Sequence, residues 1–430
     1  MNVLIKQATI IDAASPYHGK VKDIFITDGT ITSIANTITP NINDTVIEQQ
    51  GLHVSIGWMD IFAHFTDPGF EYRETLQTGI AAAAAGGFTA VMLLPNTNPT
   101  IDTKTQVEYI AKNAHQHLVT LYPIGAVTKN TAGKELAEMY DMQASGAIAF
   151  SDGIHAIQQT GLLLKALQYI KPFKGTIIQI PDDTSIGANG LMHEGIISTQ
   201  LGLPGKPAMA EELMVASNLK LARYAESQIH FTGVASAKSL AYIQKSKATG
   251  IAVTCSVTPY HLFFTDADVQ TYDTNLKVNP PVRTAEDKQA LIEALANNTI
   301  DCVASHHIPQ HTDAKVCEFE YAKNGMIGLE SLFGVVGILV NEQFTLQHLI
   351  DKLTVRPRTI FNVEMPLLKE GAKACITLFN PCTEYIFTEK MIYSKSNNSA
   401  FIGKQLKGKI IGTIHNNQVH LNDTLMHEKF

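Results

Sequence analysis

The chain has 430 residues, of which 45% are hydrophobic and 17% are charged, a balance typical of a globular protein. Its formal net charge of −7 argues against broad binding to nucleic acid, which needs a basic face. The five cysteines lack a paired metal-type spacing, so we expect reduced thiols in a cytoplasmic protein. We expect neither a signal peptide nor a membrane span, because the N-terminus lacks a charged leader and glycines interrupt the most apolar run.

The order of predicted elements indicates a barrel flanked by β-rich ends. The first fifty residues consist of short β-branched segments separated by Asp, Gly and Asn turns, which predicts strands. From residue 53 onward, strand-like runs alternate with amphipathic helical stretches. The first of these runs ends at His64, and the others cover residues 88–95, 117–127, 147–153, 175–181, 228–234, 251–259 and 300–308. Eight βα units over roughly 260 residues predict an α/β fold of the (β/α)8 TIM-barrel type.

A doubly wound open sheet is the competing architecture, but no Gly-x-Gly-x-x-Gly turn follows an early strand. The last sixty residues return to strand-like segments such as ACITLFN and KIIGTIHNNQVHL. We therefore expect the two ends of the chain to pair into one small β-sandwich beside the barrel. The predicted domains are residues 1–52 and 363–430 for the sandwich and residues 53–362 for the barrel.

Barrel enzymes carry their reacting groups at the C-terminal ends of the strands. Read in chain order, these ends are His64, Asn96, Asp152, Ile180 with Asp182 and Asp183, Gly233, His261 and His306-His307. The set offers too few nitrogen and oxygen ligands from separate strands for a two-metal centre, because even one catalytic zinc takes three protein ligands.

Several motifs in fixed order point to a known family. DIFAHFTDPGFEYRET is followed by AAAAAGGFTAVMLLPNTNP, AFSDG, EGIISTQLGLPGKPAMAEE, SVTPYHLFFTD, NLKVNPPVR, IDCVASHHIP and GMIGLESLFG, and the order ends in SKSNNSAFIGKQLKGKIIGTI. Over nearly the whole chain this pattern resembles class I dihydroorotases of the amidohydrolase superfamily. The resemblance implies a metal-dependent hydrolase barrel of pyrimidine biosynthesis, with a binuclear zinc centre that hydrolyses and closes the dihydroorotate ring.

The departures from this pattern gather at the functional positions that the resemblance implies. The lost-ligand positions are Phe62 for the first histidine of Asp-x-His-x-His, Ile180 for the fifth strand's histidine and Gly233 for the sixth strand's. Phe, Ile and Gly side chains have no donor atom, so no surrounding group can restore a metal ligand there.

Two further departures concern the substrate and the proton. Thr66 stands where the family has an arginine that grips the substrate carboxylate, and His306 stands at the catalytic aspartate position. An imidazole cannot replace a carboxylate that both binds a metal and accepts a proton from water. The family's Phe-Ser-Asp-Asp-Gly is one residue shorter here, which leaves open whether Asp152 sits at the bridging carboxylate position.

The leading hypothesis is therefore a dihydroorotase-like pseudoenzyme with a dismantled zinc site, no confident catalytic residue and no expected cofactor. Some members of the resembled family are noncatalytic partners of aspartate transcarbamoylase. On that ground we expect a homo-dimer or a complex with aspartate transcarbamoylase, and neither nucleic-acid nor membrane binding. The simplest role for Phe62 and Ile180 is to fill space that ligands occupy in the family, and Gly233 suits a tight strand end.

Two alternatives stay open. An active cyclic-amide hydrolase could use a rearranged mononuclear zinc site built on His64, Asp152 and His306, or these histidines could be hydrogen-bonded remnants. A small-molecule sensor could use Asn96, Asn279 and Thr66 as pocket residues, although both asparagines adjoin prolines in turns, where Asn is common. Outside these sets, His261 is expected to have a structural role at a helix start, and Asp182 and Asp183 are expected in a loop or helix cap.

Overall fold

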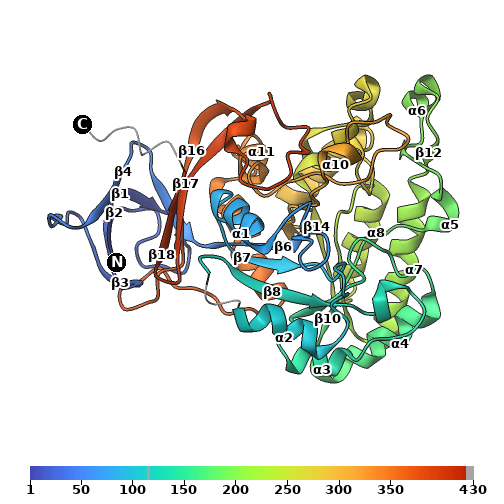
Figure 1. The fold of residues 1–430 in the computed structure, drawn as a ribbon, viewed down its shortest axis with the longest axis horizontal. Coiled ribbons are helices and arrows are strands. Elements are labelled where there is room, and N and C mark those ends of the chain that lie inside the picture. Colours follow the sequence, from blue (N-terminus) through green and yellow to red (C-terminus); the bar gives the residue numbers. More distant parts are fainter. Residues whose placement is uncertain (114–116, 423–430) are drawn as a thin grey trace.

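A parallel barrel forms the larger part of the computed structural model, which describes residues 1–113 and 117–422 (Figure 1). Its strands follow the order β15-β14-β13-β10-β9-β8-β7-β6 in one sheet of eight. They are β6 (Trp58–Ala63), β7 (Phe88–Leu93), β8 (Thr120–Gly125), β9 (Ala149–Phe150), β10 (Thr176–Gln179), β13 (Gln228–Phe231), β14 (Val253–Val257) and β15 (Cys302–Val303). Each lies within a predicted run, so the predicted barrel is confirmed.

The barrel closes where β15 meets β6. The carboxylate of Asp60 on β6 accepts hydrogen bonds from the backbone N of Ser305, at 2.7 Å, and from its hydroxyl, at 2.8 Å. Farther along the same seam, the backbone N of His64 donates to the carbonyl oxygen of His307 at 2.9 Å. Asp60 is fully buried. Its side chain therefore joins β6 to the segment after β15, although β6 and β15 are not paired with each other in the ladder of the sheet.

Helices such as α2, α4, α7 and α8 lie around the outside of the barrel, and others lie at its mouth or against the terminal sheet (Figure 1). The helices are α1 (Leu76–Ala85), α2 (Lys104–Asn113), α3 (Met139–Ala144), α4 (Thr160–Ile170), α5 (Thr184–Gly187), α6 (Ile196–Leu201), α7 (Met209–Ala225), α8 (Ala237–Ala248), α9 (Pro259–Phe263), α10 (Ala285–Ala296), α11 (Leu332–Gly337), α12 (Leu346–Leu353) and α13 (Val355–Ile360). The alanine-rich α1 lies close to the barrel at Gly79, where a Cβ would come within 2.5 Å of the Phe65 ring. The lack of a side chain at Gly79 therefore allows this close approach. No helix in residues 1–113 and 117–422 is long and apolar enough to cross a membrane.

The two ends of the chain build a second sheet of eight strands beside the barrel, which confirms the predicted sandwich (Figure 1). Its strands are β1 (Asn2–Ile10), β2 (Val21–Thr27), β3 (Thr30–Ala35), β4 (Thr45–Glu48), β5 (His53–Ile56), β16 (Ile376–Ile386), β17 (Gln405–His415) and β18 (Gln418–Leu421). β5 pairs in parallel with β1 and antiparallel with β16. β5 therefore belongs to the terminal sheet, although residue 53 was the first of the predicted barrel domain. Residues 423–430 of the predicted C-terminal segment lie outside the described residues.

A short flap completes the barrel mouth. β11 (Met192–His193) and β12 (Gly205–Lys206) pair in parallel between β10 and α7. A Cβ at Gly190 would lie 2.6 Å from the Cβ of Lys206, so the flap can fold this tightly only with glycine there. The flap brings Lys206 to the C-terminal ends of the strands.

Candidate functional site

A cavity of about 700 Å³ opens at the C-terminal ends of the barrel strands. Its lining includes four residues that the sequence singled out as site or lost-ligand positions, His64, Asp152, Ile180 and Asn279. Cations also face it, from Arg73, Lys134 and Lys206. The cavity lies where barrel enzymes place their chemistry, so it is the candidate site.

Three of the positions that the sequence singled out form one packed unit. The buried imidazole of His306 stacks on the ring of Phe62, with 4.4 Å between centroids and 28° between planes. A Cβ at Gly233 would lie 2.8 Å from Cε1 of His306. The His306 ring therefore occupies the space that any side chain at position 233 would need. Phe62 and Ile180 in turn belong to one buried apolar cluster.

His306 is held neutral by its surroundings. Burial lowers its pKa to about 3, and the nearby His261 and His230 act in the same direction. Its Nε2 lies 2.7 Å from the hydroxyl of Thr232, which in turn accepts a hydrogen bond from Ser256 at 2.9 Å. The Thr232 hydroxyl therefore links Nε2 of His306 to Ser256, and the Tyr260 hydroxyl lies 3.5 Å from Nδ1.

The same hydrogen-bond chain continues into the barrel. Nε2 of His230 lies 3.1 Å from the Ser256 hydroxyl, and Nδ1 lies 2.8 Å from the hydroxyl of Thr254. Burial lowers the pKa of His230 to about 3. The polar groups inside the barrel thus satisfy one another, as buried polar groups must.

His64 and Asp152 are each hydrogen-bonded to a residue that is not one of the candidate metal ligands. His64 Nε2 donates to the carbonyl oxygen of Asn96 at 2.9 Å, and burial lowers its pKa to about 4. The carboxylate of Asp152 accepts hydrogen bonds from the backbone N and the hydroxyl of Thr128, at 2.8 and 2.6 Å. Burial nevertheless raises the pKa of Asp152 to about 6.

These contacts do not assemble the predicted mononuclear site. Within residues 1–113 and 117–422, no three His, Cys, Asp or Glu side chains are grouped so that they could hold a metal ion. The geometry therefore does not bring His64, Asp152 and His306 together as ligands.

Two of the predicted pocket residues support loops and do not line the cavity. The Asn96 side chain accepts from the backbone N of Ile154 at 3.0 Å and donates to the carbonyl oxygen of Asp152 at 3.0 Å. The buried hydroxyl of Thr66 lies 2.9 Å from the carbonyl oxygen of Glu74, to which it donates. Both side chains point into the backbone of neighbouring loops, which sequence spacing alone does not reveal.

Asn279 does line the cavity, together with an ion pair that is largely shielded from solvent. Lys206 Nζ lies 2.8 Å from Oδ2 of Asp182 and donates to Oδ1 of Asn279 at 2.9 Å. The amide nitrogen of Asn279 donates to Asp182 at 3.0 Å. Asp183 caps α5 through the backbone N of Ser185, as predicted for a helix start.

His261 has the structural role predicted for it. Its backbone N donates to the N-cap hydroxyl of Thr258 at the start of α9. Its Nε2 donates to the carbonyl oxygen of Pro280 at 3.1 Å. His261 thereby ties α9 to the segment that carries Asn279.

Sequence reasoning did not single out several lining residues, among them Arg73, Lys134, His155, Lys206 and Tyr260. Arg73 lies in the loop after β6 and Lys206 lies in the flap, so neither stands at the C-terminal end of a barrel strand. The signal for them was present, because FEYRET and LGLPGKP are parts of the motifs that carried the family resemblance.

The fold defines an amidohydrolase-type barrel protein. The L-hydantoinase (dihydropyrimidinase) from Arthrobacter aurescens superposes with a TM-score of 0.81 at 22% identity, over 97% of this chain and 95% of that one. The D-hydantoinase (dihydropyrimidinase) from Thermus sp. gives 0.79 at 18% identity, over 98% and 95%. At these identities the likeness concerns the fold alone.

Sequence comparison identifies the family. A model described as "Dihydro-orotase-like" matches residues 53–239. The dihydroorotase of Syntrophus aciditrophicus is 39% identical over 96% of this chain and 98% of its own length. That of Pelotomaculum thermopropionicum is 39% identical over 99% of this chain and 100% of its own length. The chain belongs to the dihydroorotase family.

The residues at the barrel mouth do not fit the binuclear zinc centre that the resemblance implies. Phe62, Ile180 and Gly233 carry no donor atom, and the His306 ring is packed between Phe62 and Gly233 with Nε2 bonded to Thr232.

Proposed function

We propose that this chain is a noncatalytic member of the dihydroorotase family whose metal centre has been replaced by packing. The observation that carries the proposal is the stack of His306 on Phe62, which fills the space beside Gly233. A metal ligand must offer a lone pair toward an open position, whereas these side chains are apolar or already hydrogen-bonded. Losing several ligands together abolishes metal-assisted hydrolysis, since each one is needed to hold and activate the attacking water.

The test compares this protein with a relative. Both this protein and the Syntrophus aciditrophicus dihydroorotase are purified, zinc is counted by mass spectrometry, and turnover of dihydroorotate and of carbamoyl aspartate is measured. We expect saturable turnover and bound zinc in the relative and neither in this protein. Stoichiometric zinc with saturable turnover that disappears in His64→Ala, but survives in the exposed control His348→Ala, would favour the mononuclear hydrolase and overturn the proposal.

The second part of the proposal concerns a partner. We infer that the chain serves as a structural partner of an aspartate transcarbamoylase, on the ground of its family and its altered site. Cytoplasmic location belongs to the same proposal and is supported by the free, buried thiols of Cys255, Cys302 and Cys375.

Co-expression with the transcarbamoylase of the same source tests this part. We expect the two chains to co-elute as one complex on size exclusion, and the transcarbamoylase to lose stability when this chain is left out. A transcarbamoylase that elutes and melts identically with and without this chain contradicts the partnership. A homo-dimer of this chain alone would then remain as the simpler assembly.

A further inference from the structure

A second cavity lies between the barrel and the terminal sheet. It has a volume of about 370 Å³, and its lining includes Ala85 at the end of α1, Tyr385 on β16, Lys409 on β17 and residues of the segment 387–393. None of its described lining residues lines the cavity at the strand ends. Its volume lies in the range of small-molecule sites, so we asked what ligand its walls suit.

Aromatic and aliphatic side chains form much of the wall of this second cavity. They come from Tyr385, Phe387, Met391, Tyr393 and Ile410. Phe387 belongs to a buried apolar cluster, and Tyr385 and Met391 pack against the same cluster. Packing therefore fixes their positions, and their ring faces favour a flat, apolar molecule.

Three polar groups of the lining keep their hydrogen-bonding capacity. Nζ of Lys409, the hydroxyl of Tyr385 and Oε2 of Glu330 make no hydrogen bond or ion pair with any residue that the structure describes. The other carboxylate oxygen of Glu330 accepts hydrogen bonds from the backbone N of Tyr393, at 3.2 Å, and of Ser394, at 3.0 Å. Since polar groups shielded from bulk solvent need partners, these three groups favour a ligand with polar atoms of its own.

The cations of the second cavity outnumber its acids. Lys409 and Lys390 both line it, and neither forms an ion pair with a described residue. Burial lowers the pKa of Lys409 and raises that of Glu330, which opposes a negative charge on this carboxyl group. Burial also raises the pKa of Tyr385, so its phenol keeps the proton that it can donate. The balance of charge favours an anionic ligand.

We propose that the second cavity binds a small aromatic anion, with Lys409 holding the charged group and the rings of the wall holding the apolar part. A partly buried lysine attracts an anion more strongly than an exposed one, because less solvent screens the pair. The Tyr385 hydroxyl offers a further donor. It is placed against α11, where a Cβ at Gly334 would clash with its oxygen. The inference is independent of the proposed function, because the two cavities share no described lining residue.

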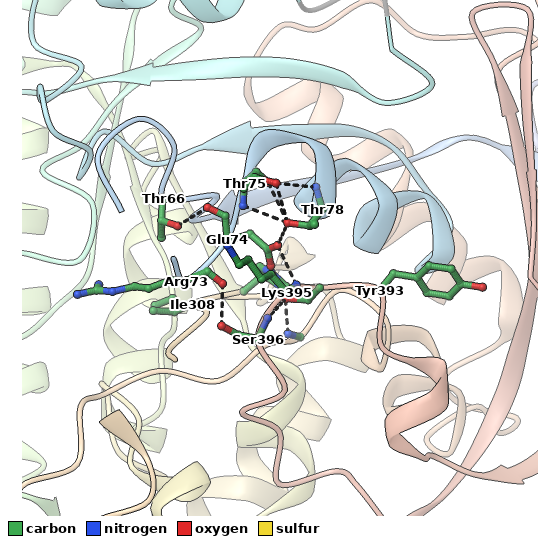
Figure 2. A network of polar contacts seen from close by, with 12 residues as sticks. Thr66, Arg73, Glu74, Thr75, Thr78, Ile308, Tyr393, Lys395 and Ser396 are labelled. Atoms are coloured by element: carbon green, nitrogen blue, oxygen red, sulfur yellow. Dashed lines mark hydrogen bonds and ion pairs between the residues drawn. The ribbon is translucent and has the colours of Figure 1, made fainter. Parts of the chain in front are cut away.

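The wall that carries Tyr393 is held by a buried network around Glu74 (Figure 2). The carboxylate of Glu74 accepts hydrogen bonds from the backbone N of Lys395, at 3.0 Å, and from the hydroxyl of Ser394. Figure 2 shows the Tyr393 side chain extending away from this network, and Tyr393 lines the second cavity. A wall that is fixed before the ligand arrives loses little conformational entropy on binding.

Calorimetric titration of the full-length protein with cinnamate tests the proposal, with uncharged cinnamamide and acetate, which lacks a ring, as comparison probes. We expect saturable binding of cinnamate, roughly 10-fold weaker binding of cinnamamide and none of acetate. Lys409→Met keeps a long side chain but removes its charge, and should weaken cinnamate binding roughly 10-fold. Lys134→Met removes the same charge from the cavity at the strand ends, so it is the matched control and should bind as the parent does.

A second variant tests the place of binding independently of charge. Met391→Trp adds bulk inside the second cavity and should weaken cinnamate binding, while circular dichroism checks that each variant is folded. The inference is overturned by the absence of saturable cinnamate binding, by equal binding of cinnamamide, or by an unchanged affinity in Lys409→Met or Met391→Trp. A loss in Lys134→Met as large as that in Lys409→Met also overturns it, because the ligand would then lie at the strand ends.

Discussion

The imidazole of His306 lies against the ring of Phe62, with 4.4 Å between their centroids. Both rings are fully buried, and His306 makes its close hydrogen bond to Thr232. The pair shows how the barrel mouth is packed at positions 62 and 306. The space is filled by rings that contact each other, and the polar nitrogen is satisfied within the barrel.

Restoring an acid at position 306 should be costly. His306→Asp would place a carboxylate against Phe62 with no cation beside it, so we expect a loss of about 3 kcal/mol or more in the free energy of unfolding. Urea denaturation measures it, with the exposed His348→Asp as the control. A loss below about 0.5 kcal/mol, the range of surface substitutions, would show that the stack does not hold the mouth together.

Gly233 should be sensitive to a single methyl group. Its φ is 70°, and an added Cβ would lie 2.8 Å from His306. Gly250 has a φ of 80° with nothing within 4 Å of an added Cβ, so Gly250→Ala reports the backbone cost alone. We expect Gly233→Ala to destabilise by about 1–3 kcal/mol more than Gly250→Ala.

A double-mutant cycle checks the cause of that difference. When His306→Ala is combined with Gly233→Ala, the clash is removed and the two losses should fall short of additivity by about 1 kcal/mol. Strict additivity would mean that the His306 ring is not the obstacle at position 233.

The buried histidines predict acid sensitivity. Burial lowers the pKa of His64 to about 4 and that of His230, His261 and His306 to about 3. The unfolded chain binds these protons near pH 6.5 and the folded chain does not. The contribution of the neutral histidines to the free energy of unfolding is therefore fully present above pH 6.5 and is lost as the pH falls below it. Each group contributes a slope of about 1.4 kcal/mol per pH unit between its two pKa values.

Urea titrations at pH 7.5, 6.5 and 5.5 measure this slope. Asp152 acts in the opposite direction, because a pKa raised to about 6 makes the folded state bind the extra proton between roughly pH 4 and 6. Burial also raises the pKa of Asp60 and Glu330, which act with Asp152, and lowers the pKa of His53, His155 and His193, which act with the four histidines. We expect the histidines to outweigh the carboxylates, which gives a net loss of stability on acidification. His230→Gln should reduce the slope of stability against pH by the contribution of about one proton. A flat profile in the parent protein would contradict the neutral state of these rings.

Glu74 should hold its loop against residues 394–395. Glu74→Gln keeps the shape but removes the charge that receives hydrogen bonds from Lys395, Ser394 and His307. We expect a loss of about 2–4 kcal/mol in the free energy of unfolding, measured by urea denaturation. The exposed Glu71→Gln is the control, and a loss no larger than that of Glu71→Gln would contradict this role of Glu74.

The fold could be predicted because local sequence patterns indicate most of its helices and strands. Apolar β-branched runs alternate with amphipathic stretches in the order that the barrel needs, and each of the eight strands lies within such a run. β4 and β5 were not predicted as separate strands, because each has only four residues and takes its place by pairing with distant strands.

The site was only partly predictable. His64, Asp152, Ile180 and Asn279 reach the cavity, because the C-terminal ends of parallel strands meet there. Thr66 and Asn96 do not reach it, since their side chains form hydrogen bonds with the backbone of neighbouring loops. No periodicity in the sequence predicts such contacts. Arg73 owes its place to contacts with residues 394–396, which lie far along the chain.

The position of β5 between β1 and β16 has a consequence for biosynthesis. When the ribosome has released the first strands of the terminal sheet, the edge of β5 that receives β16 is still open, because β16 lies beyond the whole barrel in the chain. An unpaired strand edge is a template for pairing with another chain. A nascent or truncated chain that ends before β16 therefore presents this edge to its neighbours, and the growing polypeptide needs shielding until β16 has been translated.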